Sequence, residues 1–168
     1  MLSSFIAVDT ETTGLDPEQD RIIELAAVRF EGGVPVAEFS ALLSPGDRTL
    51  SPVARLITGL TDSELAAAPQ TGETLAAFRA FVGDAPLVAH NAPFDAAHLE
   101  RALREAGCEP LTGPWLDTLL LSRTAWPAWD SHKLDTLAAR LRLPDEEAHR
   151  ALPDARRAGL LCIAALRH

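Results

Sequence analysis

Cysteine, lysine and long apolar runs are scarce in this chain of 168 residues. Its two cysteines, Cys108 and Cys162, lie far apart with no partner pattern around them, which excludes a disulfide framework and a zinc site of usual spacing. No stretch approaches the roughly 18 uncharged apolar residues that span a bilayer. The N-terminal segment has no basic region, so we expect a cytoplasmic protein without a secretory signal. Cys162 lies among apolar neighbours, which predicts a buried, inert thiol.

Positive charge is also in short supply. The chain has 15 Lys and Arg against 24 Asp and Glu, a formal net charge of −9 at pH 7. Proteins that hold a duplex by backbone charge alone are usually basic, so this balance at first argues against a nucleic-acid partner. The objection weakens if part of the negative charge is gathered in a site that binds divalent cations.

The remaining composition predicts one globular domain spanning 1–168, because hydrophobic residues make up 47% of the chain and can form a packed core. The periodicity of apolar residues and the capping signals predict strands first and then helices. Residues 61–64, TDSE, have the spacing of a capping box at a helix start, and a further helix is expected to end near Gly83. The strands are expected at 5–8, 21–30, 34–43 and 86–89, and the further helices at 93–106, 116–123, 134–143 and 151–166. This order is typical of an α/β domain whose mixed sheet is covered by helices. The succession of elements along the chain does not give the order of the strands within the sheet.

Two carboxylates follow the first apolar strand. Asp9 and Glu11 are two residues apart, so on a strand both side chains point to one face while Thr10 faces away. Carboxylates held this close repel each other unless a cation lies between them. Taken alone, the pair could equally be part of a solvated loop.

Two later segments carry further acidic residues at the start of helices. Asp95 follows the strand at 86–89 within the first turn of the next helix, where a negative charge is favourable without any further role. His149 and Asp154 lie at the start of the last helix, where each could likewise be an ordinary capping or surface residue. Each segment is weak evidence by itself.

The order of the three segments carries more weight. Asp9-x-Glu11, then His90-Asn91-x-x-Phe94-Asp95, then His149-x-x-x-x-Asp154 resembles the three motifs of the DEDDh 3′→5′ exonuclease family. Residues 8–15, VDTETTGL, are similar to the first motif throughout, and the likeness extends over most of the chain. It is closest to the proofreading ε-type, DnaQ-like subunits of bacterial replicative DNA polymerases. The resemblance implies a ribonuclease H-like mixed β-sheet flanked by helices.

The resemblance also implies a two-metal mechanism with Mg²⁺ or Mn²⁺, in line with the preference of oxygen ligands for hard cations. Asp9 would bridge both ions, Glu11 and Asp154 would bind one of them, and Asp95 would hold the second. His149 would act as the general base. The sister DEDDy group uses a tyrosine in that role, and this chain contains no tyrosine.

Substrate contacts implied by the resemblance fall around the first two motifs. Leu15 and Ile57 would stack against the terminal bases, and Phe94 would line the same pocket, although core packing is an equally good interpretation of all three. His90 is expected to support the site rather than perform chemistry. The full set of implied substrate-binding residues is Thr12, Thr13, Gly14, Leu15, Ile57, Asn91 and Phe94. Arginines considered for phosphate contacts, mostly expected on solvated helix faces, are Arg101, Arg104, Arg140, Arg142, Arg150, Arg156 and Arg157.

The expected function is therefore metal-dependent hydrolysis of single-stranded or frayed 3′ ends of DNA to nucleoside 5′-monophosphates. Two alternatives remain open: an RNA-directed exonuclease of the same family, such as an oligoribonuclease or RNase T type, and a non-catalytic polymerase or helicase accessory module. The expected partner is a DNA 3′ end. The sequence ends shortly after the last helix, which does not support a polymerase partner, and a role in replication or repair follows from the family alone.

Overall fold

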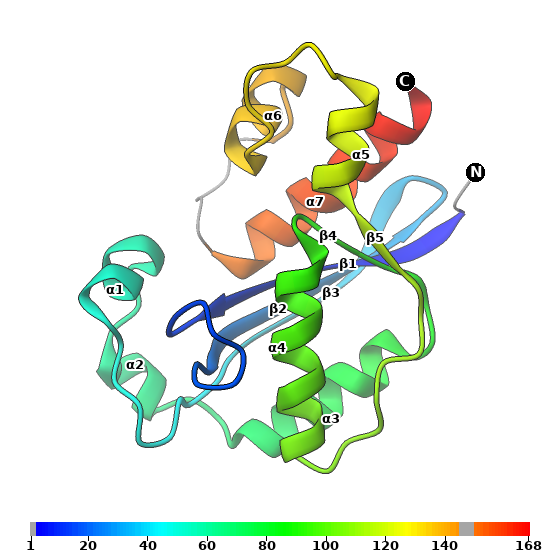
Figure 1. The fold of residues 1–168 in the computed structure, drawn as a ribbon. Helices are drawn as coiled ribbons and strands as arrows, with labels where there is room; N and C mark the ends of the chain where they lie inside the picture. The colour runs from blue at the N-terminus through cyan, green and yellow to red at the C-terminus, as the bar shows by residue number, and fades with distance from the viewer. Residues whose placement is uncertain (1–2, 145–149) are drawn as a thin grey trace.

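The computed structural model describes residues 3–144 and 150–168, which form five strands and seven helices. The strands make one mixed sheet with helices on both faces (Figure 1), so the expected α/β class is confirmed. His149 and the rest of 145–149 lie outside the described residues.

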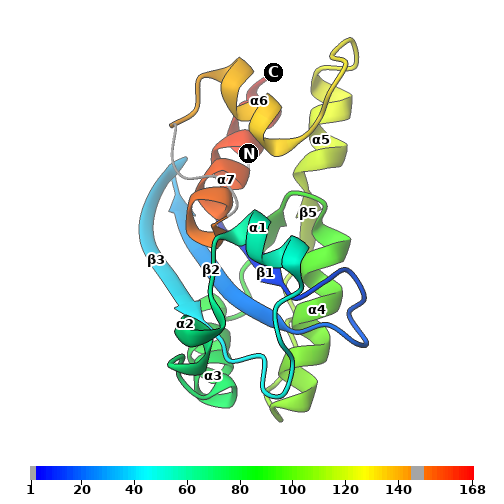
Figure 2. The ribbon, with the colours of Figure 1, turned by 90° about the vertical axis from the view of Figure 1, so that its left-hand side faces the viewer.

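The sheet is built around the first strand. Its order is β3-β2-β1-β4-β5, and β1 pairs antiparallel with β2 and parallel with β4. Figure 2 shows the curvature of the sheet, with β3 along its outer edge. The strand bounds are Ser4–Thr12 for β1, Ile22–Glu31 for β2, Val34–Leu42 for β3, Leu87–Ala89 for β4 and Trp115–Asp117 for β5.

Seven helices cover this sheet and its ends within the described part of the chain. Their bounds are Pro52–Thr58 for α1, Asp62–Ala66 for α2, Thr71–Val82 for α3, Ala92–Glu105 for α4, Thr118–Ala125 for α5, Leu134–Leu141 for α6 and Ala151–Arg167 for α7. Helix α2 begins with the expected capping box, because Thr61 caps the backbone of Glu64 and the Glu64 side chain accepts from the Thr61 backbone. Helix α1 is followed by the C-cap residue Gly59, whose φ of 70° suits glycine.

Alternate residues of β1 build two separate cores. Ile6 and Val8 pack on one face of the sheet with side chains of α3 and α4. Phe5 and Ala7 pack on the other face against α7. The two helices that carry Asp95 and Asp154 therefore cover opposite faces of the sheet, as Figure 1 shows for α4 and α7.

Most predicted elements are confirmed, with differences at their ends. The predicted helix from Leu116 is wrong in its first turn: Leu116 pairs with Val88 in β5, and α5 begins only at Thr118. The Asp117 side chain accepts from the Leu119 N–H at 2.8 Å, so Asp117 caps the helix and separates it from the strand. Helix α1 had no predicted counterpart.

Two predictions from composition can be followed in the structure. Cys162 is fully buried, and burial raises the pKa of its thiol to about 11, which fits an inert cysteine. Among the residues that the structure describes, none of the helices has the length and apolar character needed to cross a bilayer.

Candidate active site

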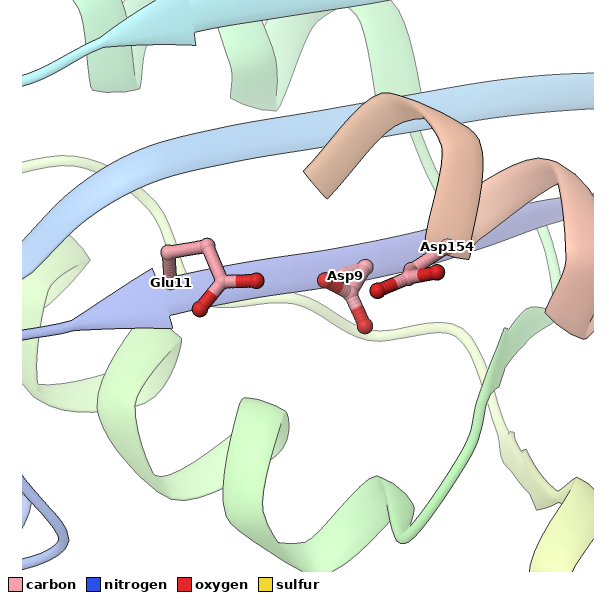
Figure 3. Close-up of side chains that lie close together, drawn as sticks. All are labelled: Asp9, Glu11 and Asp154. Carbon is pink, nitrogen blue, oxygen red and sulfur yellow. The ribbon is translucent and has the colours of Figure 1, made fainter. Parts of the chain in front are cut away.

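Three carboxylates meet at the C-terminal end of β1. Asp9 and Glu11 lie on the same face of that strand, and Asp154 reaches them from the first turn of α7 (Figure 3). Oxygen atoms of the three groups lie within 4.8 Å of one another. Asp9 and Glu11 therefore converge on one point, as expected from the strand geometry. Helix α7 adds Asp154 from near the C-terminal end of the chain.

The electrostatics of this group favour a bound cation. Burial, followed by repulsion from Asp95, Glu11 and Asp154, raises the pKa of Asp9 well above its ordinary value. Burial, followed by repulsion from Asp154, raises the pKa of Glu11 to about 7. Repulsion disfavours the ionised form of carboxyl groups held this close together. A positive charge between them offsets that repulsion and stabilises the ionised form. Because the donors are all oxygens, the residues present fit a hard divalent cation.

Asp95 approaches the same place from the other face of the sheet. It is 3% exposed in the first turn of α4, and its Oδ1 accepts a hydrogen bond of 2.8 Å from the Thr10 hydroxyl. Burial raises the pKa of Asp95 to about 7, although the bond from Thr10 opposes that shift. Asp95 is not part of the three-carboxylate group, but it borders the same cavity.

The cavity has a volume of about 720 Å³ and combines acidic, basic and apolar walls. Strand β1 and the start of α4 form one side, and α5 with the segment leading into α6 forms another. The lining residues are Asp9, Thr10, Glu11, His90, Asn91, Phe94, Asp95, Leu119, Arg123, Asp130, His132, Lys133, Leu134, Asp135 and Asp154. Four of the five predicted catalytic residues therefore border one cavity, and the fifth, His149, lies outside the described residues.

An ion pair between the partly exposed Arg150 and the buried Glu24 holds the start of α7 beside this cavity. Glu24, opposite Glu11 on β2, accepts hydrogen bonds from Arg150 Nε at 3.0 Å and Arg150 Nη2 at 2.9 Å. Its Oε2 also accepts from the Ala151 backbone N–H at 3.3 Å. Since Ala151 is the first residue of α7, these bonds hold the turn that presents Asp154.

His90 connects two walls of the cavity. Its Nε2 lies 2.9 Å from the His132 carbonyl oxygen, which can only accept, so Nε2 donates. Nδ1 lies 2.9 Å from the Thr118 hydroxyl and is then the acceptor in the neutral ring. Burial lowers the pKa of His90, which agrees with a neutral imidazole. These contacts suit the supporting role expected for His90.

The predicted substrate-contact residues occupy two regions. Asn91 and Phe94 line the cavity, and the Phe94 ring lies tilted against that of His98 with ring centroids 4.4 Å apart. Leu15 is 83% exposed and Ile57 48% exposed, so core packing does not describe either residue.

The turn after β1 is held by its own hydrogen bonds. The Thr12 hydroxyl donates to the Gly14 carbonyl at 2.6 Å, and the Thr13 hydroxyl donates to Asp20 Oδ1 at 3.0 Å. A Cβ at Gly14 would lie 2.5 Å from the Asp20 carboxylate, so a side chain at this position would displace the carboxylate that accepts from Thr13.

Several residues of the site were not found from the sequence. Thr10 could have been recognised by its place between the two acidic positions, on the opposite face of the strand. Arg123 and Lys133 line the cavity, but no local pattern marks them, because their positions depend on how α5 and α6 pack. Asp117 accepts a hydrogen bond of 3.0 Å from the Asn91 N–H. It was missed because the predicted helix began at Leu116 and placed Asp117 inside that helix.

Comparison with known proteins identifies the family. The model of the exonuclease family RNase_T matches residues 6–161. DNA polymerase III PolC-type from Bacillus cereus is 36% identical over 164 residues, and that from Halalkalibacterium halodurans is 38% identical over 159 residues. These alignments cover 98% and 95% of this chain but only 11% of each relative.

Solved structures agree with this assignment. Exonuclease X in complex with 5′ overhanging duplex DNA is 30% identical, with a TM-score of 0.78, covering 97% of this chain and 91% of that chain. Exonuclease I of E. coli in complex with a dT13 oligonucleotide has a TM-score of 0.82 at 23% identity, covering 98% and 40%, and shows the shared fold. The predicted relationship to DnaQ-like DEDDh enzymes is thereby confirmed, and the chain belongs to the exonuclease family.

Proposed function

We propose that this chain, as a single domain, is a metal-dependent 3′→5′ exonuclease that hydrolyses single-stranded or frayed 3′ ends of DNA to nucleoside 5′-monophosphates. The observation that carries the proposal is the convergence of Asp9, Glu11 and Asp154 within 4.8 Å at the edge of an open cavity of about 720 Å³. The raised pKa of Asp9 and of Glu11 supports the proposal. Carboxylates that repel one another in this way are stabilised by a bound divalent cation.

Two Mg²⁺ or Mn²⁺ ions fit the oxygen donors of this site. Asp9, Glu11 and Asp154 would hold one ion, and Asp95, on the opposite side of β1, would help Asp9 to hold the second. Divalent ions bound there supply neutralisation of charge on the reacting phosphodiester and acidify the attacking water.

Side chains of the site would then position the substrate and deprotonate the attacking water. His149 would take the proton from the attacking water, a task that suits a side chain with an ordinary pKa near neutrality. Its neighbour Arg150 is anchored to Glu24, so the chain enters α7 from a fixed point beside the carboxylates. Asn91 and Phe94 would contact the terminal nucleotide inside the cavity, while Leu15 and Ile57 offer exposed apolar surface to unpaired bases.

DNA is proposed as substrate because of the proteins that this chain resembles. Its curated relatives are named as DNA polymerases, and exonuclease X was solved with a DNA duplex. Apolar and stacking contacts tolerate any base, which suits an enzyme that removes nucleotides regardless of sequence.

The test is digestion of matched 5′-labelled DNA and RNA oligomers by the purified chain, with Mg²⁺, with Mn²⁺ and with EDTA. We expect a ladder shortened from the 3′ end, release of 5′-monophosphates and no reaction in EDTA. Asp9→Asn serves as the inactive control. A strong preference for RNA would replace the DNA assignment by the RNA-directed alternative, and no degradation of either oligomer would overturn the enzymatic proposal.

A further inference from the structure

A second wall of the active-site cavity carries the opposite charge to the carboxylates. Arg123 on α5 and Lys133, the N-cap residue of α6, both line the cavity and are both exposed. We call these two residues the cationic wall. They belong to elements that supply none of the carboxylates at Asp9, Glu11, Asp95 and Asp154.

The charges of the cationic wall are not neutralised by neighbouring acids. Asp130 and Asp135 also line this side of the cavity, but Asp130 pairs with Arg140, and Asp135 pairs with Arg157. Neither Arg123 nor Lys133 forms an ion pair with any described residue. Five of the arginines considered from sequence are instead held in such pairs: Arg101, Arg140, Arg150, Arg156 and Arg157.

Hydrogen bonds between the immediate neighbours of the two cations hold the wall together. The Ser122 hydroxyl lies 3.0 Å from His132 Nδ1, so the residues directly before Arg123 and Lys133 are bonded to each other. The His132 carbonyl also accepts from His90 Nε2, which ties this segment to the start of α4. The segments that carry these two basic residues, ten positions apart in the chain, are thus bonded to each other and to His90 at the same cavity.

We propose that the cationic wall binds phosphates of the nucleic-acid backbone on the 5′ side of the terminal nucleotide. This inference rests on the proposed exonuclease function. A polyanionic strand approaching a chain of net charge −9 meets repulsion from the acidic site, and the wall supplies the compensating positive charge beside it. A guanidinium and an ammonium group recognise phosphate without reading the base.

Two substrates of different length separate this role from a structural one. An oligothymidylate has upstream phosphates, whereas the p-nitrophenyl ester of thymidine 5′-monophosphate has a single phosphodiester and none upstream. For Arg123→Gln and Lys133→Gln, we expect the ratio of kcat/KM for the oligomer to kcat/KM for the ester to fall about two- to fivefold each. The effect should lie in KM, and the slope of log KM against log salt should be shallower by about 0.7 for each phosphate that the variant no longer binds.

Controls make the effect specific to this wall. Arg167→Gln removes the same charge from an exposed position at the C-terminal end of α7 that does not line the cavity, and it should leave the ratio unchanged. Lys133→Arg keeps the positive charge, so its ratio of the two kcat/KM values should stay close to that of wild type. If Arg123→Gln and Lys133→Gln lower both activities equally, or lower neither, the proposal is wrong.

Lys133 also permits a test that does not require catalysis, because it is the only lysine of the chain. Acetylation by N-hydroxysuccinimide acetate can be followed at Lys133 by peptide mass spectrometry, with the α-amino group as internal reference. In the Asp9→Asn variant with Mg²⁺, we expect an oligothymidylate to protect Lys133 and thymidine 5′-monophosphate not to. Equal modification with and without oligomer would overturn the proposal, even if wild-type protein proves to be an active exonuclease. Protection without any turnover by wild type would instead overturn the proposed function alone.

Discussion

The hydroxyl of Thr10 donates a hydrogen bond of 2.8 Å to Oδ1 of Asp95 and thereby joins β1 to the first turn of α4. Thr10 lies between Asp9 and Glu11 on the strand but points to the opposite face. The strand therefore presents two carboxylates to one side and holds a third from the other. This bond links the two halves of the acidic site, which come from segments 85 residues apart.

Replacing Thr10 by valine should weaken both the fold and the site. Thr10→Val keeps the shape but leaves the buried Asp95 carboxylate without this donor, at an expected loss of about 1 to 3 kcal/mol in the free energy of unfolding. Because the bond from Thr10 lowers the pKa of Asp95, its removal should raise that pKa further and shift the acid limb of the pH–rate profile upward. Urea unfolding and the pH dependence of kcat measure the two effects. Thr10→Ser keeps the hydroxyl and should behave like wild type.

Asp9→Asn should separate activity from stability. The variant removes a carboxylate that would hold metal, so kcat should fall more than the roughly 10- to 100-fold typical of changes to residues that only orient metal ligands. The same change removes a carboxyl group whose ionised form is disfavoured by burial and by repulsion from its acidic neighbours, so the metal-free variant should melt at a higher temperature than metal-free wild type. Thermal melting in EDTA checks this, and a lower melting temperature would contradict the electrostatic interpretation of the cluster.

The pH dependence of stability should reveal Glu11. Its pKa is raised from an ordinary value of 4.5 to about 7, so between those values the unfolded chain releases a proton that the folded chain retains. Without metal, stability should therefore fall as pH rises from about 4.5 to about 7, by on the order of 3 kcal/mol, and be insensitive to Glu11 above that range. Denaturant titrations in EDTA across this range would measure it.

Two comparisons test the source of that slope. In Glu11→Gln the fall in stability should be clearly smaller, because one of the coupled carboxyls is gone. Saturating Mn²⁺ should stabilise wild type more at pH 8 than at pH 5, since the cation binds the ionised carboxylates. A Mn²⁺-induced rise in melting temperature that does not depend on pH would argue against ion binding at Asp9, Glu11 and Asp154.

The ion pair between Arg150 and Glu24 should matter for both stability and catalysis. Arg150→Met leaves Glu24 buried without its guanidinium partner, and we expect a loss of about 3 kcal/mol, at the lower end for a broken buried pair because Arg150 is partly exposed. Removal of this positive charge also raises the pKa of Glu11 further. Glu24→Gln combined with Arg150→Met should recover part of the stability. If the double variant is as unstable as the sum of the single variants, the two side chains are not coupled.

Local patterns in the sequence accounted for much of the fold. Alternation along β1 placed Asp9 and Glu11 on one face, and capping signals located α2 and the ends of several helices. These features depend on residues within a few positions of each other, where backbone geometry alone decides which side chains are neighbours. The helix start at Leu116 was misjudged because its strand character comes from pairing with Val88, which no local pattern reveals.

The sequence by itself determined the family, because the ordered spacing of Asp9, Glu11, Asp95, His149 and Asp154 resembles the exonuclease motifs and the family model matches the chain. It also predicted that these five residues carry the chemistry. Only the tertiary structure decided how the described residues meet. Packing of α7 on one face of the sheet brings Asp154 to Asp9, and packing of α4 on the other brings Asp95 to Thr10. The placement of Arg123 and Lys133 on one wall likewise follows from the contact between Ser122 and His132. Such contacts depend on the burial of whole helix faces, which is a property of the assembled core rather than of any short segment.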